Sequence, residues 1–224
     1  MICPWLITCE HASAKIPPRW RALLTKPHEE HEITDLGAKD VAQALALALG
    51  VACHCGQLSR LVVDLNRSLH HPRLHAPAIK QGASTPALET LLAQHYRPFR
   101  EAVINEISHN ARAGNRTIHL SVHSFTRHFA NAVRRTDVGL LYDPSRPSER
   151  RLADAWIPRL REAGSFTVHR NQPYRGTADG HTTALRRQFP DRLYAGIEVE
   201  ICNDLLATPD ARKLWAGILA RSVS

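Results

Sequence analysis

The stretch Thr117-Ile118-His119-Leu120-Ser121-Val122-His123 alternates polar and apolar side chains, which predicts a β-strand with one polar and one apolar face. Apolar runs of strand length also occur at residues 5–9, 51–55, 58–65, 138–142, 166–169 and 195–201. Between several of these runs, apolar residues recur at helical spacing, at residues 41–49, 87–113, 149–162 and 210–220. Strands that alternate with helices are typical of an α/β sandwich around a largely parallel sheet, and we expect this fold class.

Glycines and prolines mark where these elements end. Gly50 directly follows the helical pattern of residues 41–49, as a C-terminal cap does, and Pro98 interrupts the pattern of residues 87–113. Three prolines in residues 69–86 predict a long loop, and residues 171–180 predict a turn-rich loop. The chain has 224 residues without internal repeats or low-complexity tracts, so we expect a single domain over residues 1–224.

The charge of the chain is basic but dispersed. There are 29 Lys and Arg against 21 Asp and Glu, which gives a formal net charge of +8. The arginines are scattered, and no block of five or six cations appears. A non-enzymatic, basic nucleic-acid-binding protein is therefore a disfavoured alternative. The positive net charge equally suits an enzyme with a small anionic substrate.

The cysteines and the N-terminal sequence indicate the cellular compartment of the protein. The cysteines at positions 3, 9, 53, 55 and 202 are odd in number and form no CxxC motif, which favours reduced thiols in the cytoplasm. Cys53 and Cys55 lie two residues apart in an expected strand, so their sulfurs should point to one face. The first residues lack the features of a signal peptide, and no apolar run is long enough for a membrane span. We therefore expect a cytoplasmic protein that has no membrane partner.

Polar side chains come near the ends of the expected strands. His11 follows the strand of residues 5–9, and His123 ends the strand of residues 117–123. Ligands of open α/β sheets bind at the carboxyl ends of the strands, so these side chains should gather there. Asp64, Asn66 and Arg67 come at or after the end of the expected strand 58–65. Glu198 and Glu200 lie two residues apart in the expected strand 195–201, so their side chains point to one face.

Histidines and carboxylates at strand ends are the materials of a zinc hydrolase. Catalytic zinc takes three nitrogen or oxygen ligands, and a further carboxylate serves as general base. Each residue also has an ordinary structural role open to it: His11 could line a loop, and Glu198 and Glu200 could face solvent on an edge strand. Other nucleophiles are less supported, because no G-x-S-x-G motif surrounds a serine and no activating base is visible beside Cys9 or Cys202.

Seven motifs in a fixed order resemble the N-formylglutamate amidohydrolase family, from about residue 5 to residue 206. They are Ile7-Thr8-Cys9-Glu10-His11-Ala12-Ser13, Asp35-Leu36-Gly37-Ala38, Val63-Asp64-Leu65-Asn66-Arg67-Ser68, Val122-His123-Ser124-Phe125-Thr126, Asp137-Val138-Gly139-Leu140-Leu141-Tyr142, Asn171-Gln172-Pro173-Tyr174 and Gly196-Ile197-Glu198-Val199-Glu200-Ile201-Cys202-Asn203-Asp204-Leu205.

The resemblance implies a three-layer α/β/α sandwich similar to zinc exopeptidases and a metal-dependent hydrolysis of a linear amide. It implies Zn²⁺, or another divalent metal, held by His11, Asp35 and His123. It also implies that Glu200 is the general base, with Glu198 as the alternative. The N-cap of the following helix is the alternative role of Asp35.

N-formyl-L-glutamate, which would be hydrolysed to formate and L-glutamate in histidine degradation, is the substrate that the resemblance implies. It is a dianion, so arginines should bind it. The candidate substrate-binding residues are Arg60, Asp64, Asn66, Arg67, Asn171 and Tyr174.

Two substitutions leave the acyl substrate open. The chain has Cys202 where the family usually has arginine, and Arg127 where it usually has proline. Hydrolysis of another N-acyl amino acid, or of a peptidoglycan-type amide, is therefore an alternative within the same fold. The sequence does not indicate the oligomeric state.

Overall fold

The computed structural model describes residues 4–130 and 132–223 and is built around one six-stranded sheet. The strand order is β2-β1-β3-β8-β6-β7. All neighbouring strands are parallel except β6 and β8, so the sheet is mostly parallel, as the sequence predicts. The strands are β1 (Trp5–Cys9), β2 (Cys53–Cys55), β3 (Thr117–Phe125), β6 (Val138–Leu141), β7 (Val168–Arg170) and β8 (Tyr194–Cys202).

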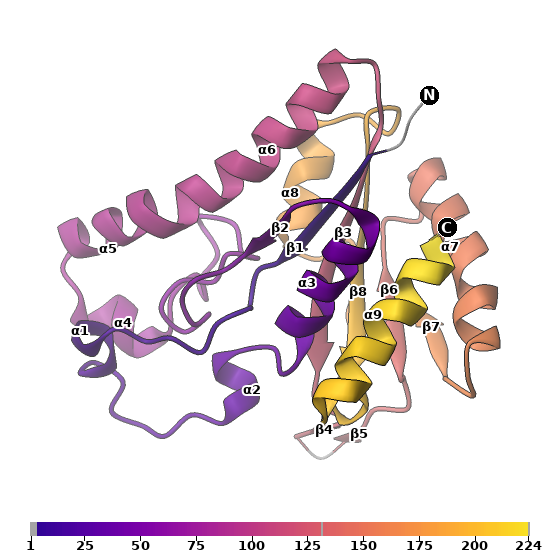
Figure 1. Cartoon of the computed structure of the whole chain (residues 1–224). Helices are drawn as coiled ribbons and strands as arrows, with labels where there is room; N and C mark the ends of the chain where they lie inside the picture. Colours follow the sequence, from indigo (N-terminus) through magenta and orange to yellow (C-terminus); the bar gives the residue numbers. More distant parts are fainter. Residues whose placement is uncertain (1–3, 131, 224) are drawn as a thin grey trace.

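Helices cover both faces of this sheet, which confirms the three-layer arrangement (Figure 1). One face packs against α3 (Ala38–Leu49), α7 (Pro147–Glu162) and α9 (Pro209–Val223) through a large apolar cluster. The opposite face packs against α6 (Arg97–Arg112) and α8 (His181–Gln188) through a smaller cluster that includes Leu6, Val103 and Tyr194. No helix in the described ranges is both long enough and apolar enough to cross a membrane.

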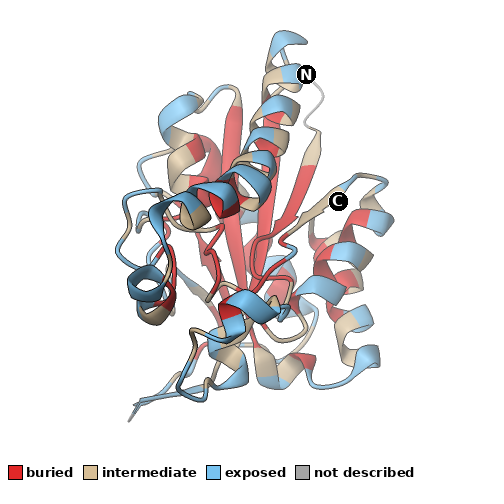
Figure 2. Ribbon diagram, turned by 90° about the vertical axis from the view of Figure 1, so that its left-hand side faces the viewer, coloured by how far each residue is buried: buried red, intermediate tan, exposed pale blue. Residues whose placement is uncertain are grey.

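The central strands are buried on both faces (Figure 2). Every residue of β8 is buried, and eight of the nine residues of β3 are buried. Apolar residues of β3 and β8 face α3, α7 and α9, whereas the opposite face carries the polar residues His119, Ser121, His123, Glu198 and Glu200. Burying polar groups costs free energy unless they form hydrogen bonds or ion pairs. The polar residues on this face of β3 and β8 therefore require a polar network or a ligand.

The prediction of a strand at residues 58–65 is wrong. This segment is irregular, and its apolar residues are buried without joining the sheet. Leu58, Val62, Val63 and Leu65 pack in a separate cluster with residues of the neighbouring helices. An apolar run therefore indicated burial correctly but did not distinguish a strand from a buried loop. Asp64, Asn66 and Arg67 consequently lie in a loop rather than after a strand.

The expected long loop of residues 69–86 is only partly a loop. It contains α4 (Pro77–Gly82) and the start of α5 (Thr85–Leu91), both of which have a proline in the first turn, where proline needs no amide hydrogen. A π-helical segment, Leu92–Tyr96, joins α5 to α6, and Pro98 lies in the first turn of α6. The sequence analysis did not predict α8, the short helices α1 (Pro18–Arg21) and α2 (Glu30–Ile33), the 3₁₀ turn Asn203–Leu206, or the hairpin of β4 (His128–Phe129) and β5 (Ala132–Val133).

Candidate metal and catalytic site

Three side chains from distant parts of the chain meet at the carboxyl ends of β1 and β3. His11 follows β1, Asp35 precedes α3, and His123 lies near the end of β3. One ligand atom from each lies within 4.8 Å of the others, and all three residues are buried. Asp35 Oδ2 is 2.7 Å from His123 Nδ1 and 3.3 Å from His11 Nδ1. Two imidazole nitrogens and a carboxylate oxygen therefore converge as a divalent metal would require.

Asp35 is not the N-cap of α3. The N-cap is Gly37, which adopts a positive φ of 75°, and no side chain caps the helix there. A Cβ at Gly37 would also approach the side chain of Leu206. The turn through Gly37 thus leaves the Asp35 carboxylate free to face the two histidines.

Carboxylates hold the outer nitrogens of both histidines. His11 Nε2 donates to Asp64 Oδ1 at 2.7 Å. His123 Nε2 lies 2.9 Å from Ser121 Oγ and 3.3 Å from Glu10 Oε2, and Ser121 Oγ itself donates to Glu10 at 2.7 Å. Such partners fix the orientation of metal-binding imidazoles, and here they turn both Nδ1 atoms toward Asp35.

The carboxylates around the histidines are held ionised. Burial raises the pKa of Glu10, but hydrogen bonds from His123 and His181 outweigh this effect and lower it well below its usual range. Burial likewise opposes ionisation of Asp35 and Asp64, yet their histidine neighbours lower the pKa of both. Burial lowers the pKa of His123, but Asp35 and Glu10 outweigh it and raise this pKa well above its usual range. The cluster therefore attracts positive charge, either protons or a cation.

Glu200 lies beside His123 in the register of β3 and β8. It is buried, and its Oε2 is one of the few buried side-chain oxygens of the described residues without a hydrogen-bond partner. Burial, together with repulsion from Asp35 and Glu198, outweighs the attraction of His123 and raises the pKa of Glu200 to about 7. Gly139 pairs with Glu200 from β6 and places no side chain over it.

Glu198 is held differently although it faces the same side of β8. Its Oε1 accepts a hydrogen bond from Thr182 Oγ1, at the start of α8. Glu198 is therefore anchored to α8, whereas Glu200 has an oxygen available for a ligand. This difference favours Glu200 over Glu198 as a group that exchanges a proton.

Arginines approach the cluster from the loop of residues 56–76. Arg60 bridges two carboxylates, with Nη1 3.3 Å from Asp35 and Nη2 3.3 Å from Asp64. Arg67 Nη1 donates to the carbonyl of Asp179, while its Nε lies 3.8 Å from Asp64. A cavity of about 270 Å³ opens beside these groups, and its lining includes Arg60, Asp64, Arg67, Arg73 and His75.

The other predicted substrate-binding residues are distributed around the site. Asn66 Oδ1 accepts from the backbone of His181 at 2.6 Å, which ties the loop to α8. Asn171 Oδ1 accepts from the backbones of Tyr142 and Gly176, so this oxygen shapes its own loop. Tyr174 is 43% exposed as a whole residue, while partial burial of its hydroxyl group and the charge of Glu200 raise its pKa. The substrate-binding roles of Asn66, Asn171 and Tyr174 stay predictions.

The sequence analysis assigned no role to the buried network behind His123. Glu10 accepts from Thr8 and Ser121, and its Oε1 also accepts from His181 Nδ1 at 2.8 Å. Glu10 belongs to a quoted motif, so its position could have been noted, but His181 comes from a helix that was not predicted. With 14 histidines in the chain, residue type alone gave no signal for it.

Comparisons with known proteins agree with this architecture. A crystal structure of a gene product of Agrobacterium tumefaciens is similar with a TM-score of 0.84 and 29% identity, covering 99% of this chain and 89% of that chain. The crystal structure of an N-formylglutamate amidohydrolase from Ralstonia eutropha JMP134 shares the fold, with a TM-score of 0.64 and 16% identity over 98% of this chain and 92% of that chain. No protein with a curated description matches significantly. The family model of N-formylglutamate amidohydrolase matches residues 3–207, and the chain therefore belongs to this family.

Proposed function

We propose that this protein is a metal-dependent amidohydrolase that converts N-formyl-L-glutamate and water to formate and L-glutamate. The family supports hydrolysis of an N-formyl amino acid. The observation that carries the metal-dependent mechanism is the convergence of His11, Asp35 and His123 beside the buried Glu200. The resulting site combines a cation-binding set with a separate carboxyl group of raised pKa.

Zn²⁺ fits the donor set best. Two imidazole nitrogens and one carboxylate leave a coordination position open, as catalytic zinc sites do, although other divalent metals also accept these ligands. When bound, such a metal supplies a Lewis acid that polarises the formyl carbonyl and lowers the pKa of water. Asp64, Glu10 and Ser121 would keep the two imidazoles oriented toward it.

Glu200 is the proposed general base and acid. A carboxyl group with a pKa of about 7 can take a proton from the attacking water near neutral pH. It can then return that proton to the departing amine nitrogen, so that the amine leaves as a neutral group. Glu198, which is hydrogen-bonded to Thr182, is the alternative in the same role.

The substrate carboxylates are expected to bind on the arginine side of the site. N-formyl-L-glutamate is a dianion, and Arg60, Arg67 and Arg73 line the cavity of about 270 Å³ beside Asp64. A guanidinium binds a carboxylate in a bidentate manner, which suits recognition of a small diacid. Asn66, Asn171 and Tyr174 are proposed to complete the substrate contacts at the edge of the site.

Several finer predictions remain part of the proposal. The chain is proposed to act as one domain over residues 1–224, in the cytoplasm and in histidine degradation. The alternatives are hydrolysis of another N-acyl amino acid, hydrolysis of a peptidoglycan-type amide, and non-enzymatic binding of nucleic acid.

A substrate panel distinguishes the proposed substrate from other N-acyl amino acids. We would compare N-formyl-L-glutamate, N-formyl-L-aspartate, N-acetyl-L-glutamate and N-formyl-L-leucine by kcat/KM. The proposal predicts the highest value for N-formyl-L-glutamate and a large loss for the leucine compound, which lacks the second carboxylate. Equal values for the glutamate and leucine compounds would contradict recognition of a diacid. Preference for an acetyl group would favour another N-acyl amino acid as substrate.

A further inference from the structure

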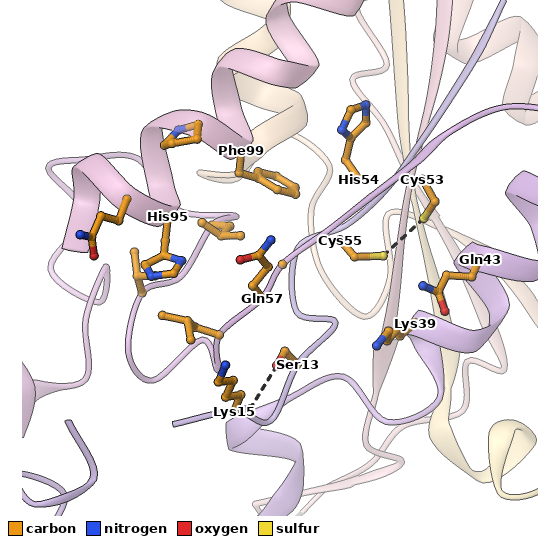
Figure 3. A pocket seen from close by; sticks show the side chains of 16 residues that line it. Ser13, Lys15, Lys39, Gln43, Cys53, His54, Cys55, Gln57, His95 and Phe99 are labelled. Carbon is orange, nitrogen blue, oxygen red and sulfur yellow. Dashed lines mark hydrogen bonds between the residues drawn. The ribbon is translucent and has the colours of Figure 1, made fainter. Parts of the chain in front are cut away.

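A second cavity lies beside the edge strand β2, apart from the candidate metal site. Its volume is about 700 Å³, within the range of sites for small molecules. None of the candidate metal ligands, nor Glu200, lines it. Figure 3 shows its lining side chains. They come from the loop after β1, from α3, from β2 and the loop that follows it, and from the π-helical segment and the start of α6.

Two thiols of β2 face this cavity from the same side of the strand. Cys53 and Cys55 are both half-buried, and their sulfur atoms lie 3.5 Å apart, joined by a hydrogen bond (Figure 3). His54, between them, pairs with Glu106 on α6 through a distance of 2.8 Å. The two cysteines therefore form a dithiol that small molecules can reach.

The surroundings favour the thiolate at Cys55. Either sulfur can donate in the hydrogen bond between Cys53 and Cys55, and donation by Cys53 lowers the pKa of Cys55. The charges of Lys39 on α3 and His54 lower this pKa further. Burial and Glu10, from the end of β1, act in the opposite direction but do not outweigh these groups. The buried Cys9 of β1 is the register partner of Cys55, and burial raises the pKa of Cys9 well above its usual value.

The cavity lining carries positive and no negative side chains. Lys15 and Lys39 contribute the positive charges, whereas none of the lining residues is Asp or Glu. The amide side chains of Gln43, Gln57 and Gln94 add hydrogen-bond donors. A small anionic molecule would therefore be favoured there over a cationic one of equal size.

We propose that Cys55 is the nucleophile of a covalent site for the disulfide form of a small anionic thiol, and that Cys53 is the hydrogen-bond donor that activates it. The Cys55 thiolate attacks one sulfur of the small disulfide, a protein–ligand S–S bond forms, and the original S–S bond breaks. The departing thiolate takes a proton from water, and Cys53 remains a thiol. One S–S bond breaks as one S–S bond forms, so the exchange needs no further oxidant.

Oxidised glutathione, an anionic disulfide, and cystamine, a cationic one, are suitable probes for the full-length protein. Intact mass and fragment spectra would measure the rate and position of adduct formation. We expect one adduct, on Cys55, with glutathione reacting about tenfold faster than cystamine at low ionic strength and the difference shrinking in salt. Lys39→Gln should reduce this preference, and Cys55→Ser should abolish the adduct.

A matched pair of variants tests the role of Cys53. Cys53→Ala removes the donor, so the pKa of Cys55 should rise. The rate of adduct formation at neutral pH should then fall about threefold for each pKa unit, because the thiolate fraction falls faster than the nucleophilicity of the thiolate grows. Cys53→Ser keeps a donor and should retain more of the rate. An adduct on Cys9 or Cys202, or equal rates with both probes, would overturn the site. An unchanged rate in Cys53→Ala, or a Cys53–Cys55 disulfide as the main product, would overturn the role of Cys53.

Discussion

Replacing Glu200 by glutamine should stop turnover, preserve metal binding and remove a pH-dependent cost of folding. The amide keeps the shape of the side chain but cannot accept the proton of the attacking water. Loss of a general base reduces rates by roughly 10²–10⁴-fold. Because His11, Asp35 and His123 are unchanged, the metal content should stay equal to that of the wild type.

The magnitude of the folding effect follows from the pKa of Glu200, which rises from 4.5 to about 7 in the folded protein. A carboxyl group with a raised pKa stabilises the folded state below its unfolded pKa, and this stability is lost as the pH rises through the folded pKa. The full shift corresponds to about 3 kcal/mol. Between about pH 5 and about pH 8, the wild type should lose about 2.5 kcal/mol of unfolding free energy relative to Glu200→Gln.

Urea unfolding of both proteins in the presence of chelator, at several pH values, measures this difference directly. The comparison cancels the titration of other groups, since they are common to both proteins. Glu198→Gln is the matched control for activity, because Glu198 lies two residues away on the same strand face and is hydrogen-bonded to Thr182. This control should lose much less activity than Glu200→Gln.

Two results would refute the reasoning about Glu200. A Glu200→Gln enzyme with activity within a few fold of wild type would exclude Glu200 as the base. A stability difference that does not change between about pH 5 and about pH 8 would show that the buried carboxyl group does not hold its proton more tightly than in the unfolded chain.

Three further substitutions test the rest of the site. His123→Ala should lose both bound metal and formate release, and unchanged metal content by elemental analysis would remove His123 from the ligand set. Asp64→Asn should weaken metal affinity roughly 10–100-fold, because Asp64 holds the outer nitrogen of His11, and a competition titration with a chelating dye would detect this. Arg67→Ala should raise KM for N-formyl-L-glutamate more than it lowers kcat, and an unchanged KM in steady-state kinetics would exclude Arg67 from substrate binding.

The sequence predicted the sheet well where periodicity was strong. The alternation in residues 117–123 and the apolar run 195–201 correspond to β3 and β8, which are the central pair of the sheet. Residues 58–65 failed because burial in the cluster around Val62 and Val63 gives the same apolar pattern as a strand. Helix α8 was missed because its eight residues carry few apolar positions.

Prediction of the site depended on different information for different residues. Strand position pointed to His11, His123 and the pair Glu198 and Glu200. The choice of Glu200 over Glu198 and the role of Asp35 came from family resemblance, since a carboxylate before a helix usually caps it. The partnership of Asp64 with His11 and of Glu10 with His123 could not be predicted from the sequence. The first pair spans 53 residues and depends on the path of the loop that carries Asp64. The second pair depends on the pairing of β1 with β3, and periodicity encodes neither.

The central claim is that formate release from N-formyl-L-glutamate requires a metal held by His11, Asp35 and His123. The most direct test is formate release by the purified protein before chelation, after chelation and after addition of one equivalent of zinc. The account predicts loss of activity on chelation and its recovery with zinc in the wild type, but no recovery in His123→Ala. Full activity of a chelated protein shown by elemental analysis to be metal-free would contradict it.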